Sequence, residues 1–251
     1  MENDKKNIID LKDNVLEDKK YLDVLYSDKR RPKSNYPVQL AKHLIENYYL
    51  GKGSILDIGC GRGDLLKAFH NKGMKVTGTD ISPSSIKSCE PHLVKTADLE
   101  KQKLPFDNEE FNFVFSKSVI EHLHNPMPLL KEALRVVKKD GKVVIMTPSW
   151  VHHGWGPFYL DYTHVTPFTK PSLRDAMEMA GFIDVEVYYF YQLPFLWKWP
   201  GLKILVKLFS KLPLPYKPMY DINLPLEVNK LIQFSKEVML LGVGHKPNEK
   251  T

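Results

Sequence analysis

Cysteine and long apolar runs are scarce in this chain. Cys60 and Cys89 are its only cysteines in 251 residues, so we expect no disulfide framework and a reducing, cytoplasmic location. No apolar run reaches the roughly 18 to 20 uninterrupted residues that a membrane-spanning helix needs. The Lys-rich N-terminus carries no signal-peptide pattern. The sequence therefore argues against a disulfide-stapled secreted domain and against a membrane-spanning protein.

The chain also has no internal repeat and no strong excess of one charge. Its 43% hydrophobic and 26% charged residues are enough to bury one full core, so we expect one globular domain with appendages. The formal net charge of +6 could favour nucleic acid, anionic lipid or an acidic substrate. An excess this small is more often a matter of ordinary solubility.

Short apolar runs alternate with helical patterns along most of the chain. Strands are predicted over 54–58, 74–79, 94–97, 111–116, 142–148 and 185–191. Helices are predicted over 37–49, 64–71, 128–137 and 170–180, with another that begins near Pro83. The alternation predicts an α/β fold with a Rossmann-like, mostly parallel sheet, helices on both faces and a C-terminal helical and aromatic extension. Ligands of such sheets bind beyond the carboxyl ends of the strands, where the strand order reverses.

Composition divides the chain into three segments. Residues 1–36 begin with a stretch dominated by Lys, Asp, Glu and Asn, and are expected to form an arm that could cap the domain. Residues 37–191 form the α/β domain, with an insertion over about 149–169. Residues 192–251 form a basic, amphipathic extension.

The stretch S-I-L-D-I-G-C-G-R-G-D-L-L, residues 54–66, joins a predicted strand to a predicted helix. Its glycines let the backbone turn sharply and approach a ligand closely. The dinucleotide fingerprint G-x-G-x-x-G would need a glycine at position 64, where this chain has Asp64. A carboxylate at the start of that helix would repel a pyrophosphate but tolerate a cofactor that carries positive charge. NAD is therefore the weaker interpretation.

Four motifs follow one another in a recognisable order. They are D-I-G-C-G-x-G at 57–63, Asp80 at the end of the next predicted strand, T-A-D-L at 96–99, and F-D-N-E-E-F-N-F-V-F-S-K-S-V-I-E-H-L at 106–123. Over about residues 40–190 the chain resembles class I S-adenosylmethionine-dependent methyltransferases, of the methyltransferase 11-like, small-molecule branch. The resemblance implies S-adenosylmethionine as the cofactor and S-adenosylhomocysteine as its product.

The resemblance also implies roles for individual residues. Asp80 would hold the ribose hydroxyls, and Asp98 and the backbone of Leu99 would bind the adenine. The predicted cofactor-binding residues are Asp57, Gly59, Cys60, Gly61, Gly63, Asp80, Ile81, Asp98, Leu99, Ser116 and Lys117.

Three of the cofactor assignments have structural alternatives. Asp57 could order the glycine loop, with some direct cofactor contact, and Asp98 could be a solvated turn residue. Asp80 could cap the helix near Pro83, although Ser82 can do so instead. Cys60 is expected to be chemically inert.

Methyl transfer needs an aligned nucleophile and, for a hydroxyl acceptor, a base. Two regions offer one: the loop after the predicted strand 111–116, and D-Y-T-H-V-T-P-F-T at 161–169, within the insertion that commonly covers the acceptor in this family. The catalytic candidates are His164, His122 and Asp161, with Asp161 orienting His164. The alternative for His122 is a structural or substrate-positioning role. The alternative for Asp161 and His164 is that their hydrogen bonds hold the loop in place.

The motifs that would point to other acceptors are missing. The loop after the predicted strand 111–116 has neither the [DNS]-P-P-[YFW] sequence of many base and amide methyltransferases nor a Pro-Cys pair. A hydroxyl or amine of a small-molecule or lipid- or glycan-linked acceptor fits better. RNA methylation and a non-catalytic, nucleoside-binding scaffold are the alternatives, and nucleic acid is disfavoured because no RNA-binding motif is appended. Several histidines fall in loops, but no metal-ligand spacing occurs, so we assign no metal site.

The stretch 192–213 is predicted to contain a helix with a narrow basic stripe and a broad apolar face, entered at Trp197 and Trp199. Lys203, Lys207 and Lys211 recur every four residues among apolar side chains, and Trp197 and Trp199 precede them. This pattern is typical of a helix that lies on an anionic bilayer, here through residues 197–212 on the inner face of the membrane. Packing of the apolar face on the core, on a second subunit or over the acceptor pocket is the alternative, which we favour. Residues 226–243 are predicted to form a final amphipathic helix or a strand.

Overall fold

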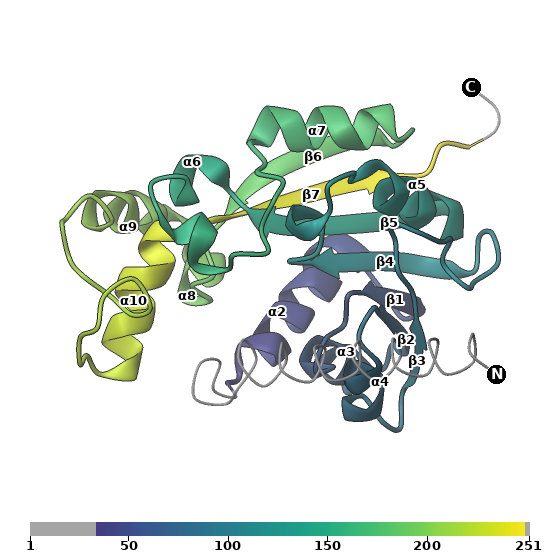
Figure 1. Ribbon diagram of the computed structural model, residues 1–251, viewed down its shortest axis with the longest axis horizontal. Coiled ribbons are helices and arrows are strands. Elements are labelled where there is room, and N and C mark those ends of the chain that lie inside the picture. Colours follow the sequence, from purple (N-terminus) through teal and green to yellow (C-terminus); the bar gives the residue numbers. More distant parts are fainter. Residues whose placement is uncertain (1–33, 249–251) are drawn as a thin grey trace, which may run out of the picture.

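A seven-stranded sheet forms the centre of the computed structural model, which describes residues 34–248 (Figure 1). The strand order is β3-β2-β1-β4-β5-β7-β6. The strands are β1 (Ser54–Ile58), β2 (Lys75–Asp80), β3 (Leu93–Thr96), β4 (Phe111–Lys117), β5 (Val137–Pro148), β6 (Ile183–Phe190) and β7 (Met239–His245). The predicted arm over 1–36 lies almost wholly outside the described residues.

The order of the parallel strands reverses beside β1. That strand pairs in parallel with β2 on one side and with β4 on the other, while β4 continues the parallel pairing to β5. The carboxyl ends of β1, β2 and β4 therefore lie along one edge of the sheet. This arrangement confirms the predicted Rossmann-like fold and identifies the edge where a ligand is expected.

The C-terminal strand β7 corrects the division of the chain at residue 191. It runs antiparallel to both of its neighbours and is inserted between β5 and β6. The last described part of the chain therefore belongs to the central sheet. The prediction of a helix or a strand over 226–243 is resolved as both, since α10 (Leu226–Lys236) precedes β7.

Helices cover both faces of the sheet (Figure 1). Helices α5 (Met127–Val136) and α7 (Lys170–Met179) pack on one face, and α2 (Tyr36–Leu44) and α3 (Asp64–His70) pack on the other. Strand β1 contributes alternately to the two cores, Leu56 to the first and Ile55 to the second. A short helix, α4 (Pro83–Ser88), follows β2, and α6 (Trp150–His153) follows β5.

Local sequence accounts for where several helices begin. The Ser82 hydroxyl accepts a hydrogen bond from the Ser85 amide and caps α4, as predicted. Thr169 and Ser172 form a reciprocal capping box at the start of α7. The predicted helix 37–49 is α2 followed by a wider π-helical turn, Ile45–Tyr49.

The basic helix expected within 192–213, after Trp197 and Trp199, is α9 (Lys203–Phe209), which is shorter than expected. Pro200 and Gly201 belong to a 3-10 turn that separates it from α8 (Phe195–Lys198). Val206 is buried beside Leu193 and Leu196.

Most of the apolar face of α9 is exposed. The exposed fractions of Ile204, Leu205 and Leu208 are 69%, 61% and 57%. Packing of this face on the core is therefore wrong for these three residues. Within residues 34–248, no helix is both long and apolar enough to cross a bilayer.

Candidate active site

The glycine loop after β1 is held against the end of β2. The Gly59 and Cys60 amides both donate to the Thr79 carbonyl oxygen, at 2.7 and 3.0 Å. Gly59 has a φ of +75°, and a Cβ there would lie 2.2 Å from the Val119 side chain. Gly61 has a φ of +52°, and a Cβ there would meet no atom within 4 Å. The loop is thus closely packed at Gly59 and open at Gly61, where a ligand can approach the backbone.

Asp80 joins this loop to the end of β2. Its Oδ2 accepts a hydrogen bond from the Gly61 amide at 2.8 Å, and its Oδ1 accepts one from the Ser82 amide at 3.0 Å. Because both oxygens are fixed by backbone donors, the carboxylate has one defined orientation at the edge of the sheet. The prediction that Asp80 is not the helix cap is confirmed by the Ser82 hydroxyl.

Asp57 is buried directly below the loop, with 2% of its surface exposed. Burial, together with the negative charge of Asp80, raises the pKa of this carboxyl to about 7 against the opposing effect of Lys117. The structure thus keeps a carboxyl at the ligand edge in an environment that penalises its charged form.

The other predicted cofactor residues lie along the same edge. Ile81 follows β2 and is 62% exposed, whereas Leu99 is buried. The Asp98 carboxylate accepts from the Glu100 amide at 3.1 Å and pairs with Lys101 Nζ at 2.9 Å. This geometry is that of a turn residue, the alternative given for Asp98.

Three more predicted residues are tied into the protein itself. The Ser116 hydroxyl donates to the Ile58 carbonyl oxygen at 3.1 Å, and Gly63 occupies the N-cap position of α3. The Cys60 and Cys89 sulfur atoms lie 3.9 Å apart, and the hydrogen bond shared with Cys89 and burial raise the pKa of the Cys60 thiol. A raised thiol pKa agrees with the expectation that Cys60 is unreactive.

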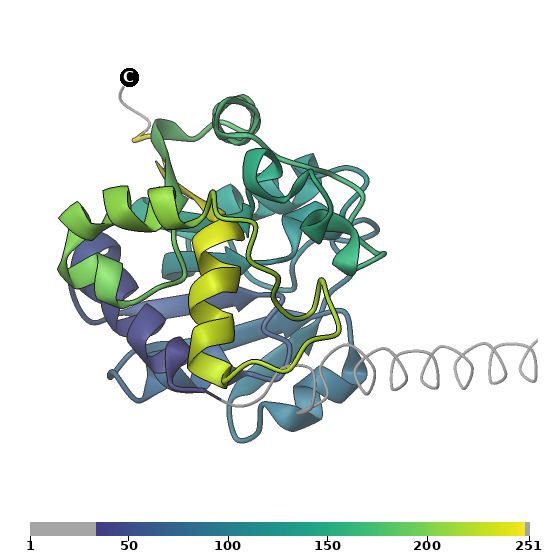
Figure 2. The same cartoon turned by 90° about the vertical axis from the view of Figure 1, so that its left-hand side faces the viewer.

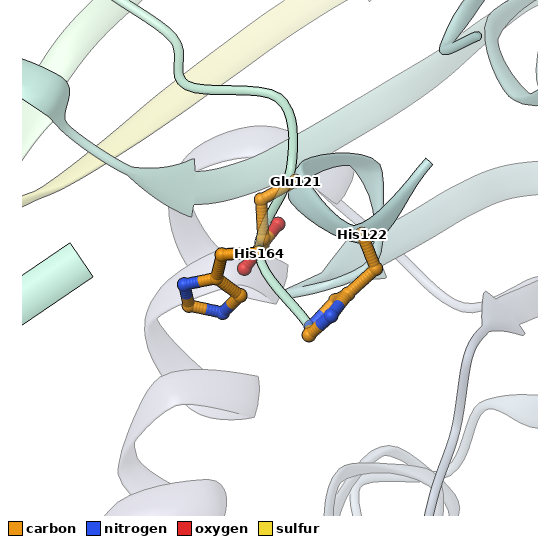
Figure 3. Close-up of side chains that lie close together, drawn as sticks. All are labelled: Glu121, His122 and His164. Atoms are coloured by element: carbon orange, nitrogen blue, oxygen red, sulfur yellow. The ribbon is translucent and has the colours of Figure 1, made fainter. Parts of the chain in front are cut away.

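The predicted catalytic residues converge from two loops (Figure 3). The rings of His122 and His164 have their centroids 4.7 Å apart and meet edge to face. His122 Nδ1 lies 2.8 Å from the Thr163 hydroxyl, which donates to Asp161 Oδ1 at 2.6 Å. His164 Nδ1 lies 2.6 Å from the Phe158 carbonyl oxygen. Asp161 therefore contacts His122 through Thr163, and the orientation of His164 by Asp161 stays a prediction.

Glu121 is a member of this cluster that the sequence did not reveal. It is fully buried, its backbone carbonyl oxygen accepts from the Val165 and Thr166 amides, and its Oε2 accepts from the Thr147 hydroxyl at 2.9 Å. Burial raises the pKa of the carboxyl to about 7, although the Thr147 hydrogen bond opposes the shift. Its neighbours Ile120 and Leu123 are apolar, so the local pattern indicates only packing.

The other loop histidines lie outside this cluster. His124 is exposed and lies 3.6 Å from Glu100. His152 Nδ1 contacts the Ser149 hydroxyl, and His153 Nδ1 contacts the Ser149 carbonyl oxygen. Burial lowers the pKa of His153 to about 4, so its ring is neutral at physiological pH.

A cavity of about 490 Å³ lies at the opposite edge of the sheet. Its lining includes Ser54 at the start of β1 and Lys75 at the start of β2. Ligands of open α/β sheets bind at the carboxyl ends of strands, so this amino-terminal cavity is not the expected active site.

The substitution Asp57→Asn tests how much the buried, ionised carboxylate lowers the free energy of unfolding. An acid whose pKa is raised by folding contributes stability that is complete below its unfolded pKa, about 4, and that is lost as the pH rises through 7. Between pH 5 and pH 8 the variant should therefore gain on the order of 3 kcal/mol in free energy of unfolding relative to wild type. Urea unfolding at both pH values measures the gain, and a difference that stays constant with pH would contradict the assignment.

Comparison with known sequences gives the family. A family model described as a methyltransferase domain matches residues 28–187. An uncharacterized protein of Methanocaldococcus jannaschii is 37% identical over 97 residues, which are 39% of this chain and 45% of that protein. A protein of Idiomarina loihiensis named ubiquinone biosynthesis O-methyltransferase is 29% identical over 176 residues, 60% of this chain and 70% of that one. The matches cover less than half the length of several curated relatives.

Solved structures share the fold at low identity. An S-adenosylmethionine-dependent methyltransferase from Archaeoglobus fulgidus gives a TM-score of 0.60 at 23% identity, covering 88% of this chain and 98% of that chain. A phosphoethanolamine N-methyltransferase from Haemonchus contortus, solved with S-adenosyl-L-methionine, gives 0.59 at 16% identity, covering 92% and 60%. The family match over residues 28–187 shows that the chain belongs to the methyltransferase domain family, and the solved structures show that it shares the fold of S-adenosylmethionine-dependent methyltransferases.

Proposed function

We propose that this methyltransferase moves the methyl group to a hydroxyl or amine of a small-molecule or lipid- or glycan-linked acceptor. The observation that carries the proposal is the arrangement at one edge of the sheet. A loop with open space at Gly61 packs through Gly59 against Val119, which lies three residues before His122 of the polar cluster. The loop suits a nucleoside cofactor, and the cluster suits the polar group of an acceptor.

The residues around Gly61 fit S-adenosylmethionine. Each oxygen of a carboxylate accepts more than one hydrogen bond, so Asp80 can hold the loop amides and also accept from two ribose hydroxyls. The exposed Ile81 side chain offers an apolar surface to the adenine ring. Asp80 gives the edge a negative charge that suits a cationic ligand, and such a ligand would favour the charged form of Asp57. Bound S-adenosylmethionine supplies an electrophilic methyl group on a positively charged sulfur.

The cluster of Asp161, His122 and His164 would act on the acceptor. During transfer, the acceptor oxygen or nitrogen bonds to the methyl carbon, the C–S bond breaks with its electron pair on sulfur, and the acceptor gives up a proton. An imidazole can take this proton directly. The chain from Asp161 through Thr163 fixes the His122 ring and would stabilise its protonated form.

The names of relatives support a small acceptor. One relative is named ubiquinone biosynthesis O-methyltransferase, and one structural neighbour is a phosphoethanolamine N-methyltransferase. Both names describe transfer to a small or lipid-related molecule, and both are statements about those proteins.

The α9 end of the molecule supports an amphiphilic acceptor (Figure 2). Residues 192–220 contain five lysines and no acidic residue. Lys203 and Lys207 are exposed on α9 beside the exposed Ile204, Leu205 and Leu208 side chains. A basic rim around an apolar face is complementary to anionic lipid. The insertion lies close by, because a Cβ at Gly156 would be 3.1 Å from the Met219 side chain. We therefore propose a peripheral contact with the inner face of the membrane.

Asp80→Ala should weaken binding of S-adenosylmethionine by about 1.5 to 3 kcal/mol, the contribution of hydrogen bonds to a charged group. Calorimetry with the full chain measures this change, and Asp175→Ala on the exposed side of α7 is the control of equal charge. Asp80→Asn, which keeps an acceptor for the Gly61 amide, separates cofactor contact from loop collapse. Unchanged affinity in both Asp80 variants would remove the ribose role.

The acceptor class is tested by transfer of a radiolabelled methyl group into a cell extract that is then separated into lipid, glycan, RNA, protein and small-molecule fractions. We expect label in the lipid, glycan or small-molecule fraction, because the cluster is built for a single polar group and the surface beside it for an amphiphile. Label confined to RNA or protein would contradict the proposed acceptor.

Membrane contact is tested by co-sedimentation with vesicles of phosphatidylglycerol and phosphatidylcholine. Replacement of Lys203, Lys207 and Lys211 by Gln should weaken binding by roughly two orders of magnitude at low salt, since each surface lysine contributes about 1 kcal/mol. A matched triple variant at Lys42, Lys87 and Lys131, which are exposed elsewhere, should bind like wild type. Equal losses in the two variants would indicate only a general charge effect.

A further inference from the structure

Glu121, His122 and His164 together form a group with the composition of a metal site (Figure 3). Within the described part of the chain, they are the one group of three potential ligands whose donor atoms all lie within 4.8 Å of one another. In a tetrahedral site with bonds of about 2.1 Å, the ligand atoms lie roughly 3.4 Å from one another. Side-chain movements of about 1 Å would therefore bring the three atoms around an ion.

The hydrogen bond of each histidine fixes which nitrogen carries its proton. The Phe158 carbonyl oxygen can only accept, so His164 Nδ1 donates to it. The Thr163 hydroxyl donates its proton to Asp161, so its oxygen accepts from His122 Nδ1. In both neutral rings the lone pair consequently lies on Nε2, the atom that most often binds a metal. These partners are the kind that orient metal-binding histidines.

The Glu121 carboxylate supplies a second, independent observation that points to a cation. Its Oε2 accepts from Thr147, but its Oε1 is buried without a hydrogen bond of good geometry, although Ser118 and the Glu121 amide lie close enough to lower the pKa of the carboxyl. A buried carboxylate oxygen left unpaired is costly, and such exceptions call for an explanation. A positive ion beside Oε1 would satisfy it.

We propose that Glu121, His122 and His164 bind a divalent cation of the Zn²⁺, Co²⁺ and Fe²⁺ class. Two imidazoles and one carboxylate suit this class, whereas Mg²⁺ and Ca²⁺ prefer an all-oxygen set. The three ligands come from two loops that are distant in sequence, which is why no metal-ligand spacing is visible in the chain. Asp161, Phe158 and Thr147 hold the ligands from behind.

The role of the ion at the acceptor rests on the function proposed above. Three protein ligands leave coordination positions open, and an acceptor hydroxyl bound there would have a lowered pKa. Its proton would pass to water, because the Nε2 lone pairs are then engaged with the ion. With an ion bound, His122 and His164 would act as its ligands and would not accept the proton of the acceptor.

Metal binding is tested on the full chain after treatment with a chelator, by titration with Co²⁺ followed through its visible absorption and with Zn²⁺ followed by calorimetry. We expect one ion per chain and a loss of affinity of at least tenfold in His164→Ala and in Glu121→Gln. His124→Gln, a change of an exposed histidine two residues after His122, should bind like wild type.

Two further measurements separate this site from folding and from the proposed function. Variants that lose Co²⁺ but keep their affinity for S-adenosylmethionine have lost a site and not the fold. No stoichiometric binding by wild type, or equal affinity in wild type, His164→Ala and Glu121→Gln, would overturn the proposal. Stoichiometric binding without methyl transfer to any small or lipid-linked acceptor would support the metal site and contradict the proposed function alone.

Discussion

The hydrogen bond between the Gly61 amide and the Asp80 carboxylate, 2.8 Å long, links the ends of β1 and β2. It fixes a glycine loop that faces open space at the carboxyl edge of the sheet. The Thr79 carbonyl oxygen secures the start of the same loop. The position of Asp80, and with it the shape offered to a nucleoside, thus follows from backbone contacts between two neighbouring strands. The geometry of this edge is therefore set by the parallel pairing of β1 and β2.

The second half of the site depends on a buried acid. Glu121 is held by Thr147 on β5, and its backbone carbonyl oxygen holds the insertion through Val165 and Thr166. The same residue therefore positions the loop after β4 against the insertion that carries His164. Burying Asp57 and Glu121 costs free energy, because desolvation penalises their charged forms. Such costs are typical of sites where a charged ligand completes the structure.

Sequence patterns predicted the strand, the glycine turn and the helix cap at the carboxyl edge of the sheet, because each of these elements is local. The strand Ser54–Ile58, the glycines after it and the cap at Ser82 are encoded within a few residues of one another. Features that arise from distant pairing were missed. The short run at β7 gave no sign of insertion between β5 and β6, and nothing near Glu121 signals that its carboxyl meets two histidines. The helix expected after Trp199 begins only at Lys203, because Pro200 and Gly201 lie in a separate 3-10 turn that the regular spacing of the lysines does not indicate.

The proposed function requires that one edge of the sheet bind both the cofactor and the methyl acceptor. A crystal structure with S-adenosylhomocysteine tests it most directly. We expect the ribose hydroxyls to lie within hydrogen-bonding distance of Asp80. We also expect the sulfur atom to face Glu121, His122 and His164. A nucleoside bound elsewhere, such as in the cavity lined by Ser54 and Lys75, or a sulfur directed away from the cluster, would contradict the account.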